Sequence, residues 1–394
     1  MDFRLNETQQ LLRKTVREFA ETEIRPFALE WDEAQHFPAE LVPKLAAMGL
    51  MGIQCPEEYG GAGMSAGEYC ICIEELARVC PGVALSVAAH NGLCSAHVLK
   101  AGTPAQKDRY VIPLASGRRI GAWGLTEASS GSDAGSMRTT ATRTGDGWVL
   151  NGAKVFTTHG RVGDVFVIIA VTDPRGGRQG VSAFIVEKGT PGLTSGKKEN
   201  KLGMRASDTS EVILHDCHVA HDQLLGAEGT GFVDAMRVLD AGRIGIAALA
   251  VGLAQGAFDA ALKYSIARKS FGQPLSSYQA IQWKLADNAT HIDAARLLTY
   301  RAAQTQDECE PITLPSAMAK LFASEMAVRV AEDCVQIHGG YGFVKDYPAE
   351  KYFRDVKLTT IGEGTSEIQR MIIARHLVRA AMEREANYTP QPRP

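Results

Sequence analysis

The sequence lacks an excess of charge of either sign, a long hydrophobic run and any paired cysteine motif. Its 42 Lys and Arg residues are balanced by 45 Asp and Glu residues, which gives a formal net charge of -3 without a basic block. This balance argues against a protein that coats nucleic acid. No apolar run reaches the roughly 18 residues that a bilayer requires, so we expect no membrane association.

Eight cysteines are scattered along the chain, and none belongs to a C-x-x-C pair. Such thiols are typical of buried side chains in a reducing compartment. The N-terminal segment carries Asp2, Glu7 and Glu18 and has no small-residue cleavage site, so it fits neither a secretory signal nor an acid-poor transit peptide. We therefore expect a cytoplasmic protein, or a mitochondrial matrix protein if the chain is a processed organellar form.

The 39 glycines are distributed unevenly along the 394 residues. Of these, 19 lie between Gly121 and Gly231. Clustered glycines indicate turns, so the middle third should differ in architecture from its flanks. Helical periodicity on both sides, and short segments rich in Val, Ile, Thr and Phe between them, support this division.

These patterns predict an α+β multidomain fold in three parts. Residues 1–120 form an N-terminal α-helical domain, and residues 121–232 form a central β-barrel or β-sandwich domain. Residues 233–384 form a C-terminal four-helix bundle, followed by a flexible tail over 385–394. The expected helices cover 7–30, 41–49, 66–79, 84–100, 104–116, 245–268, 278–305, 314–338 and 366–384, and the expected strands cover 138–143, 148–156, 164–171, 181–187 and 211–215.

One acidic residue, Glu363, stands between two glycines immediately before an expected helix start. Gly362 and Gly364 have no side chains that would shield or pair its carboxylate, and they let the backbone approach a ligand closely. The following helix, capped by Thr365 or Ser366, offers free N–H donors. The pattern indicates a positioned carboxylate, and a solvated glutamate at a helix N-terminus is the alternative.

Six blocks, in the same order along nearly the whole chain, resemble the acyl-CoA dehydrogenase family, in particular its short-chain and isovaleryl-type members. The resemblance implies that family's helical, β and helical fold. The matching blocks are Trp123-Gly124-Leu125-Thr126-Glu127 with Gly131-Ser132-Asp133, Leu150-Asn151-Gly152-Ala153-Lys154, Lys201-Leu202-Gly203-Met204-Arg205, Arg268 with Phe271-Gly272, Gln336-Ile337-His338-Gly339-Gly340-Tyr341-Gly342, and the segment around Glu363.

The resemblance implies FAD-dependent α,β-dehydrogenation of a short-chain acyl-CoA, straight or branched, to the trans-2-enoyl-CoA. Glu363 matches the family's base, which removes the α-proton while flavin N5 accepts the β-hydride. Some relatives place the base on an earlier helix, and that position is Gly242 here, which cannot act as a base. The electron-transferring flavoprotein is the implied partner, in fatty acid or branched-chain amino acid degradation. An oxygen-using acyl-CoA oxidase and a non-catalytic flavin- or CoA-binding protein are the alternatives.

The resemblance assigns a first set of flavin contacts to the segment from Trp123 to Ser132. Leu125 and Thr126 would bind the isoalloxazine, and Ser132 would face the flavin phosphates or the phosphopantetheine of the substrate. Ala128 stands where the family has a proline, which loosens the loop without removing a donor. A polar turn after a strand is the other interpretation of this segment.

A second set of flavin contacts is implied for Phe156, Thr157 and Thr158. Phe156 replaces the family's Trp, so an aromatic face remains while the indole N–H is lost, and Thr158 would donate toward flavin N5. Phe156 as an ordinary residue of the β core is an equally good interpretation. Three residues after the base complete the implied flavin shell: Thr365, Ser366 and Glu367.

A third set of positions corresponds to residues that, in the family, reach the FAD of a neighbouring subunit. The resemblance therefore implies a homotetramer built as a dimer of dimers. A guanidinium supplies a fixed fork for phosphate, and glycines let backbone N–H groups approach it. A surface charge is the alternative for the arginine of this set. The positions are Arg268, Phe271, Gln279, Gln336, Ile337, Gly339 and Gly340.

Substrate contacts are implied for Ser132, Asp240, Arg243, Gly362 and Gly364. Asp240 and Arg243 are three residues apart and share a helix face, so an ordinary ion pair is the rival interpretation. Gly362 stands where many straight-chain members have Tyr, which predicts room for branched acyl groups. We expect no metal site, because the tract that contains His215, His218 and His221 does not have the spacing of a closed site.

Overall fold

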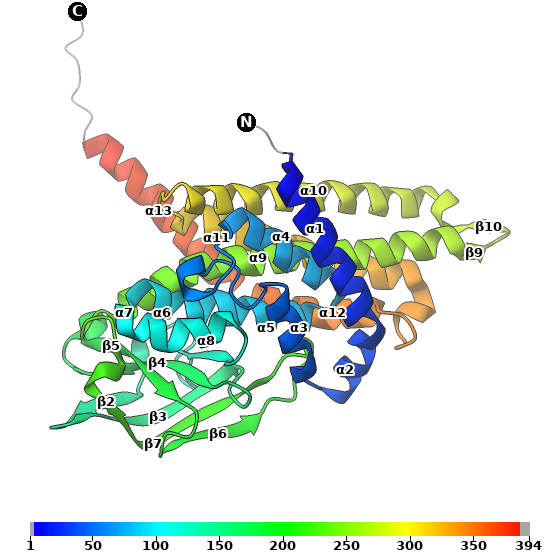
Figure 1. Ribbon diagram of the computed structural model, residues 1–394. Helices are drawn as coiled ribbons and strands as arrows, with labels where there is room; N and C mark the ends of the chain where they lie inside the picture. The colour runs from blue at the N-terminus through cyan, green and yellow to red at the C-terminus, as the bar shows by residue number, and fades with distance from the viewer. Residues whose placement is uncertain (1–3, 387–394) are drawn as a thin grey trace, which may run out of the picture.

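The computed structural model describes residues 4–386, and it confirms the predicted order of helical, β and helical parts (Figure 1). In the first part, Pro26 lies in a 3-10 turn that separates two helices where one was expected, since proline cannot continue the hydrogen-bonding pattern. A π-helical turn at His90–Ser95 likewise divides the expected helix 84–100. The helices of this part are α1 (Glu7–Phe19), α2 (Ala28–Ala34), α3 (Val42–Ala47), α4 (Ala66–Val79), α5 (Pro81–Ala89), α6 (Ala96–Ala101), α7 (Pro104–Gln106) and α8 (Ile112–Ala115).

The central part is built on one eight-stranded sheet with strand order β6-β7-β3-β2-β4-β5-β8, and β1 also pairs with β4. The short or weakly apolar strands β1, β6 and β8 were not predicted, whereas β7 extends five residues beyond the expected 211–215. The strands are β1 (Gly121–Gly124), β2 (Thr140–Arg143), β3 (Gly147–Thr158), β4 (Val165–Val171), β5 (Val181–Glu187), β6 (Leu193–Lys198), β7 (Thr209–Ala220) and β8 (Leu224–Leu225).

Strand β4 is apolar on both faces because both faces are buried. Val165, Val167 and Ile169 pack in a cluster with α6 and α8, while Phe166 and Ile168 pack inside the folded sheet. This alternation follows from the two-residue repeat of a strand. The sheet therefore has its own core and also a helical cover on its other side, as Figure 1 shows.

The third part contains long helices, as predicted, and two features that the sequence patterns missed. Helix α9 begins 14 residues before the expected start at 245, and α12 was not expected at all. The expected tail at 385 is wrong for its first two residues, which continue α13, and the rest lies outside the described residues. The elements are α9 (Gly231–Ala267), β9 (Lys269–Ser270), β10 (Gln273–Pro274), α10 (Gln279–Asp307), α11 (Thr313–His338), α12 (Ala349–Val356) and α13 (Ser366–Ala386).

Helix α9 is the central helix of the molecule and packs against α4, α10 and α11. The helix has 37 residues, and its length and composition would allow it to cross a membrane. However, 78% of its most apolar 18-residue stretch is buried inside the protein. Four glycines on one side of α9 form what we call the glycine face: Gly242, Gly245, Gly252 and Gly256.

The glycine face lets α4 approach α9 backbone to backbone. A Cβ atom at Gly252 would lie 2.1 Å from the carbonyl oxygen of Glu74, and one at Gly256 would lie 2.1 Å from that of Arg78. Helix α4 is correspondingly buried at 12 of its 14 positions. The contact is therefore specified by the absence of side chains on α9.

The β part is anchored to the helices by the block Lys201–Arg205. A Cβ atom at Gly203 would lie 2.3 Å from the carbonyl oxygen of Arg354, so the loop lies directly on α12. The buried carboxylate of Asp355 accepts a hydrogen bond from the N–H of Met204 and pairs with Lys351. This family block thus has a structural explanation, which is the docking of the β part.

We expect Gly252→Ala to destabilise the protein, because its methyl group would overlap the backbone of α4. Overpacking of this kind costs roughly 1–3 kcal/mol. The free energy of unfolding in urea measures the effect. Gly145→Ala is the matched control, since that glycine is exposed, has no atom within 4 Å of its added Cβ and should change stability by less than about 0.5 kcal/mol. Equal stability of the two variants would contradict the close α4–α9 contact.

Candidate active site

The loop before α13 holds Glu363 in an unusual backbone conformation. Its φ is +53°, in the left-handed region that few non-glycine residues adopt, and Gly364 follows with a φ of +95°. Lys320 Nζ donates to the carbonyl oxygen of Gly364 at 2.8 Å, and Gln369 Nε2 donates to the same oxygen at 2.9 Å. Two buried side chains from α11 and α13 therefore fix the loop that carries the glutamate.

The carboxylate of Glu363 lies against α9 at Gly242. A Cβ atom at Gly242 would lie 2.1 Å from Glu363 Oε2, so only glycine leaves space for the carboxylate here. Glu363 Oε2 is buried and has no hydrogen-bond partner among the described residues. The alternative of a solvated glutamate is thus inconsistent with its position, although the residue as a whole is half-buried.

Burial raises the pKa of Glu363 to about 7, against the opposing positive charges of Lys320 and Arg243. Burial also lowers the pKa of Lys320 to about 8, while the charge of Glu363 acts in the other direction. The carboxylate is therefore a much stronger base than an exposed glutamate, and it is still ionised in a large fraction of molecules near neutral pH.

Asp240 and Arg243 form the ion pair that was the rival interpretation of their spacing. Thr313 Oγ1 donates to the other oxygen of Asp240 at 2.6 Å, which ties α11 to α9. Arg243 is buried, and its Nε–H has no partner among the described residues. The pair therefore shapes this side of the site and keeps one donor free.

A buried ion pair that the sequence interpretation did not single out joins the first predicted flavin segment to β3, just before the second one. Lys154 Nζ donates to Glu127 Oε1 at 2.7 Å and to the carbonyl oxygen of Leu125 at 3.2 Å. The other contacts of the Glu127 carboxylate are the N–H groups of Arg138 and Thr139. Lys154 belongs to a block that resembles the family, but no local pattern reveals that its side chain points to Glu127.

The residues of the first predicted flavin segment differ in their exposure to solvent. Leu125 is buried, Thr126 is half-buried and accepts a hydrogen bond from Val155 N–H through its carbonyl oxygen, and Ser132 is exposed. The indole N–H of Trp123 is directed elsewhere, since it donates to Nδ1 of buried His97 at 3.0 Å. The Trp123 side chain therefore has a structural partner in the helical part.

The members of the second predicted flavin segment differ in exposure. Phe156 is 65% exposed with a φ of +56°, so it is not a residue of the β core. Thr158 is half-buried, and the buried Oγ1 of Thr157 has no partner among the described residues. An exposed aromatic ring beside an unpaired hydroxyl fits a planar ligand with polar edges.

The first turn of α13 adds further groups of this kind. Thr365 Oγ1 accepts a hydrogen bond from Ile368 N–H at 3.3 Å, which confirms Thr365 as the cap. Ser366 is buried, its Oγ lacks a partner among the described residues, and Glu367 is exposed. Unpaired hydroxyls on both the β part and α13 are the expected condition of a site that holds a polar cofactor.

The structure does not bring the third set of predicted cofactor residues near Glu363. The segment from Gly242 to Ala267 rises about 38 Å along the helix axis. Arg268 follows at the far end, beside β9 and β10 (Figure 1). Arg268 lies over the ring of Tyr341 at 5.6 Å. Five other members are exposed at this end, namely Phe271, Gln279, Gln336, Gly339 and Gly340, whereas the side chain of Ile337 is buried in the core.

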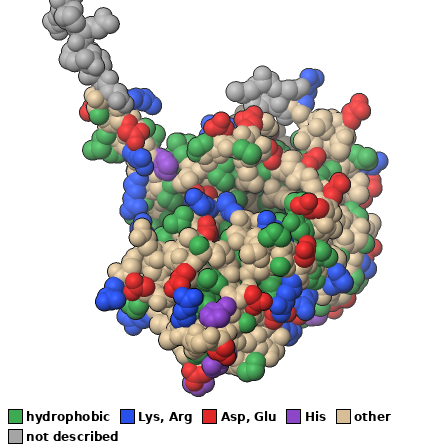
Figure 2. All heavy atoms as spheres, turned by 60° about the vertical axis from the view of Figure 1, so that its left-hand side comes forward, with side chains coloured by type: hydrophobic (Ala, Val, Ile, Leu, Met, Phe, Trp, Pro, Cys, Tyr) green, Lys and Arg blue, Asp and Glu red, His purple; other side chains and the backbone are tan. Residues whose placement is uncertain are grey.

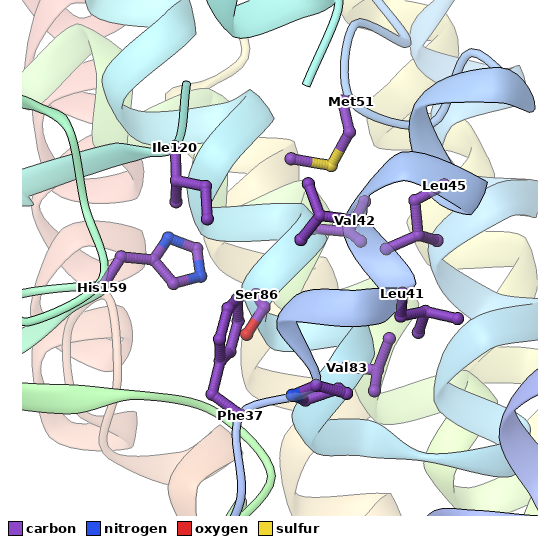
Figure 3. A pocket seen from close by; sticks show the side chains of 11 residues that line it. Phe37, Leu41, Val42, Leu45, Met51, Val83, Ser86, Ile120 and His159 are labelled. Carbon is purple, nitrogen blue, oxygen red and sulfur yellow. The ribbon is translucent and has the colours of Figure 1, made fainter. Parts of the chain in front are cut away.

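A small apolar cavity of about 20 Å³ lies elsewhere, between the first helices and the end of β3 (Figure 3). Phe37 and Ile120 line it, and the ring of His159 faces it. His159 Nδ1 donates to the carbonyl oxygen of Gly121 at 2.9 Å. The cavity has room for about one water molecule and does not include Glu363, so it is not the candidate active site.

Other kinds of site receive no support from the described part of the chain. It contains no group of three or more His, Cys, Asp or Glu side chains suited to a metal ion. Figure 2 shows acidic and basic side chains interspersed over the face that includes α13. This face therefore does not present a broad field of one sign.

Comparison with known proteins agrees with this geometry. Models of the acyl-CoA dehydrogenase N-terminal, middle and C-terminal domains match residues 6–118, 122–217 and 229–378. The short-chain-specific acyl-CoA dehydrogenase of Clostridium acetobutylicum is 47% identical over 379 residues, which are 96% of this chain and 100% of that relative.

Solved structures give the same result. Butyryl-CoA dehydrogenase from Megasphaera elsdenii is 42% identical with a TM-score of 0.94, and the match covers 96% of this chain and 100% of that one. A chain solved in work on the electron transferring flavoprotein of Acidaminococcus fermentans is 46% identical with a TM-score of 0.95 and the same coverage. The chain therefore belongs to the acyl-CoA dehydrogenase family, is an enzyme of that family, and resembles its short-chain-specific members.

Proposed function

We propose that this enzyme carries out FAD-dependent α,β-dehydrogenation of short-chain acyl-CoA thioesters, with Glu363 as the base that removes the α-proton. The observation that carries the proposal is the carboxylate itself, which is buried against Gly242 with an unpaired oxygen. A carboxylate with a pKa of about 7 accepts a carbon-bound proton more readily than one with an ordinary pKa.

The backbone of the same residue supports this role. The N–H of Glu363 makes no hydrogen bond with any described residue, so it is free to donate to a thioester carbonyl. Such a donor stabilises the negative charge that develops on oxygen as the α-proton leaves. Bound FAD would supply the acceptor for the β-hydride. Lys320 and Gln369 hold the loop so that N–H and carboxylate keep their relative positions.

The cofactor assignment rests on the family, whose members are FAD-dependent, and on the unpaired hydroxyls of the site. Thr126, Phe156, Thr158, Thr365 and Ser366 would hold the flavin. The residues near Arg268 lie at the other end of α9, too far away to reach the same FAD molecule. We infer that they serve the cofactor of a neighbouring subunit, in a homotetramer arranged as a dimer of dimers.

The electron-transferring flavoprotein is the proposed electron acceptor, since one relative was solved in work on that protein. Oxygen is the alternative acceptor, and an oxidase would differ by rapid reoxidation in air. The described cysteines are all unpaired, and seven of the eight are buried. This fits the proposed reducing compartment, the cytoplasm or the mitochondrial matrix. Fatty acid or branched-chain amino acid degradation remains the proposed metabolic role.

Glu363→Gln should bind FAD normally and lose turnover, because an amide cannot accept the α-proton. Loss of a general base costs roughly a hundredfold to ten-thousandfold in kcat. Anaerobic bleaching of the yellow holoenzyme by butyryl-CoA measures the effect. Glu30→Gln, at an exposed position of α2, is the control and should bleach like the wild type. Near-normal bleaching of the Glu363 variant would refute the assignment of the base.

The pH dependence should report the charges around the base. Glu363 acts in its ionised form, so kcat/KM should rise with pH through an apparent pKa near 7. Lys320 from α11 and Arg243 from α9 lower that pKa, and Tyr69 of α4 is the other titratable group near the carboxylate. Lys320→Met removes a positive charge and should move the acidic limb to higher pH.

Lys320→Arg keeps the positive charge. The acidic limb of its pH profile should therefore stay close to the wild-type position, even if the changed geometry lowers kcat. The measurement is kcat/KM for butyryl-CoA between about pH 5.5 and 8, where both variants are compared with the wild type. An unshifted limb in the methionine variant would show that Lys320 does not act on the base electrostatically.

The absence of a side chain at residue 362 should permit branched substrates. A Cβ atom at Gly362 would make only ordinary van der Waals contacts, with Leu358 at 3.5 Å or more, so the position beside the proposed base has room for a side chain that glycine leaves unfilled. We expect turnover of isobutyryl-, 2-methylbutyryl- or isovaleryl-CoA as well as butyryl-CoA. Gly362→Tyr should fill this space and lower kcat/KM for the branched esters more than for butyryl-CoA. A wild-type enzyme that accepts butyryl-CoA alone would contradict the expectation.

A further inference from the structure

The side chain of Tyr69 lies at the inner end of the site and is not used by the proposed reaction. The residue is buried, with 3% of its surface exposed. Its hydroxyl makes no hydrogen bond with a described residue. The hydroxyl oxygen is nevertheless not completely enclosed by neighbouring atoms. Buried tyrosine hydroxyls ordinarily have a partner. The hydroxyl therefore borders open space inside the protein.

The glycine face places this hydroxyl one helical turn from the base. A Cβ atom at Gly242 would lie 2.1 Å from Glu363 Oε2, and one at Gly245 would lie 2.6 Å from the Tyr69 hydroxyl. Carboxylate and hydroxyl thus rest on successive turns of the same face of α9, roughly 5 Å apart along its axis. Burial raises the pKa of Tyr69, and the charge of Glu363 raises it further, as expected for near neighbours.

The direction from Glu363 to Tyr69 leads into the core. Asp240 is half-buried on one side of the carboxylate, whereas Tyr69 on the other side packs in the cluster that contains Ile246 and Leu249. A third glycine, Gly92, also faces the hydroxyl, since its Cβ would lie 3.3 Å from it. A thioester at Glu363, with its large polar group toward Asp240, would extend its alkyl chain toward Tyr69.

We propose that the phenol of Tyr69 ends the acyl pocket and limits the length of the acyl chain. The inference rests on the proposed function, because it takes Glu363 to mark the position of the α-carbon. An extended alkyl chain advances roughly 1.25 Å per C–C bond, so one helical turn holds about four carbons beyond the α-carbon. Butyryl fits this space, hexanoyl reaches the ring, and octanoyl overlaps it.

The test compares kcat/KM of the holoenzyme for butyryl-, hexanoyl- and octanoyl-CoA. Tyr69→Ala should raise the octanoyl-to-butyryl ratio by roughly tenfold or more, since a few methylene groups then enter an apolar pocket. Tyr69→Phe keeps the ring and should leave the ratio within about threefold of the wild type. If thermal melting shows that the alanine variant is unfolded, Tyr69→Leu replaces it.

A second substitution, on α9, tests the same end of the acyl pocket. Gly245→Ala should push the ring of Tyr69 into the pocket and lower the hexanoyl-to-butyryl ratio. The double variant Gly245→Ala with Tyr69→Ala should lose that effect, because the overlap requires both side chains. Calorimetric titration of octanoyl-CoA into Glu363→Gln, with and without Tyr69→Ala, measures binding in the absence of turnover and should show tighter binding without the ring.

The outcomes separate this inference from the proposed function. An unchanged chain-length ratio in a folded Tyr69→Ala enzyme that still oxidises butyryl-CoA would overturn the role of Tyr69 and leave the reaction intact. A wild-type holoenzyme that oxidises none of the three esters would instead contradict the proposed function.

Discussion

The close contact along the glycine face of α9 is the constraint on which the rest of the structure depends. At Gly252 and Gly256, missing side chains let the backbone of α4 touch α9. At Gly245 the same absence admits the ring of Tyr69, and at Gly242 it admits the carboxylate of Glu363. One helix surface therefore sets both the interhelical distance and the positions of the Tyr69 ring and the Glu363 carboxylate. Closely packed protein interiors tolerate little change in volume, so a methyl group at any of these four glycines would disturb both the helix packing and the candidate site.

Glu363, the proposed base, is kept in a backbone conformation that costs free energy. A left-handed backbone at a non-glycine residue costs about 1–3 kcal/mol, and such residues persist where the surroundings hold them. Here Lys320 and Gln369 donate to the carbonyl of Gly364, and Gln369 also donates to that of Glu363 at 3.3 Å. The donors occupy the carbonyl side of the loop and leave the N–H of Glu363 free. The same lysine opposes the burial that raises the pKa of the base. Its charge thus acts on the Glu363 carboxylate, while its hydrogen bond holds the adjacent Gly364.

The sequence predicted those features that depend on local pattern. The helices at 66–79 and 314–338, the strand at 181–187 and the special position of Glu363 follow from periodicity and from flanking glycines. The range 245–268 that periodicity predicts omits the first 14 residues of α9, although the spacing of Asp240 and Arg243 indicates a shared helix face there. Gly231 and Gly242, in that segment, mark close contacts. The pairing of Lys154 with Glu127, the indole bond of Trp123 to His97 and the position of Tyr69 join residues 26 or more apart in the chain or on separate helices. No spacing rule encodes such contacts, since they exist only after the parts have packed.

The length of α9 separates two sets of residues that the family resemblance assigns to one kind of cofactor. About 38 Å of helix lies between Gly242, against the base, and the end that precedes Arg268. At that far end Phe271 is 96% exposed and Phe343 is 87% exposed, beside Arg268 and a run of glycines. Large apolar side chains are seldom left this exposed without a function. A rigid helix of this length cannot bring its two ends to one ligand. The two ends of α9 therefore cannot share one ligand, and this separation is the geometric support for the proposed neighbouring subunit, whose site the residues near Arg268 would complete.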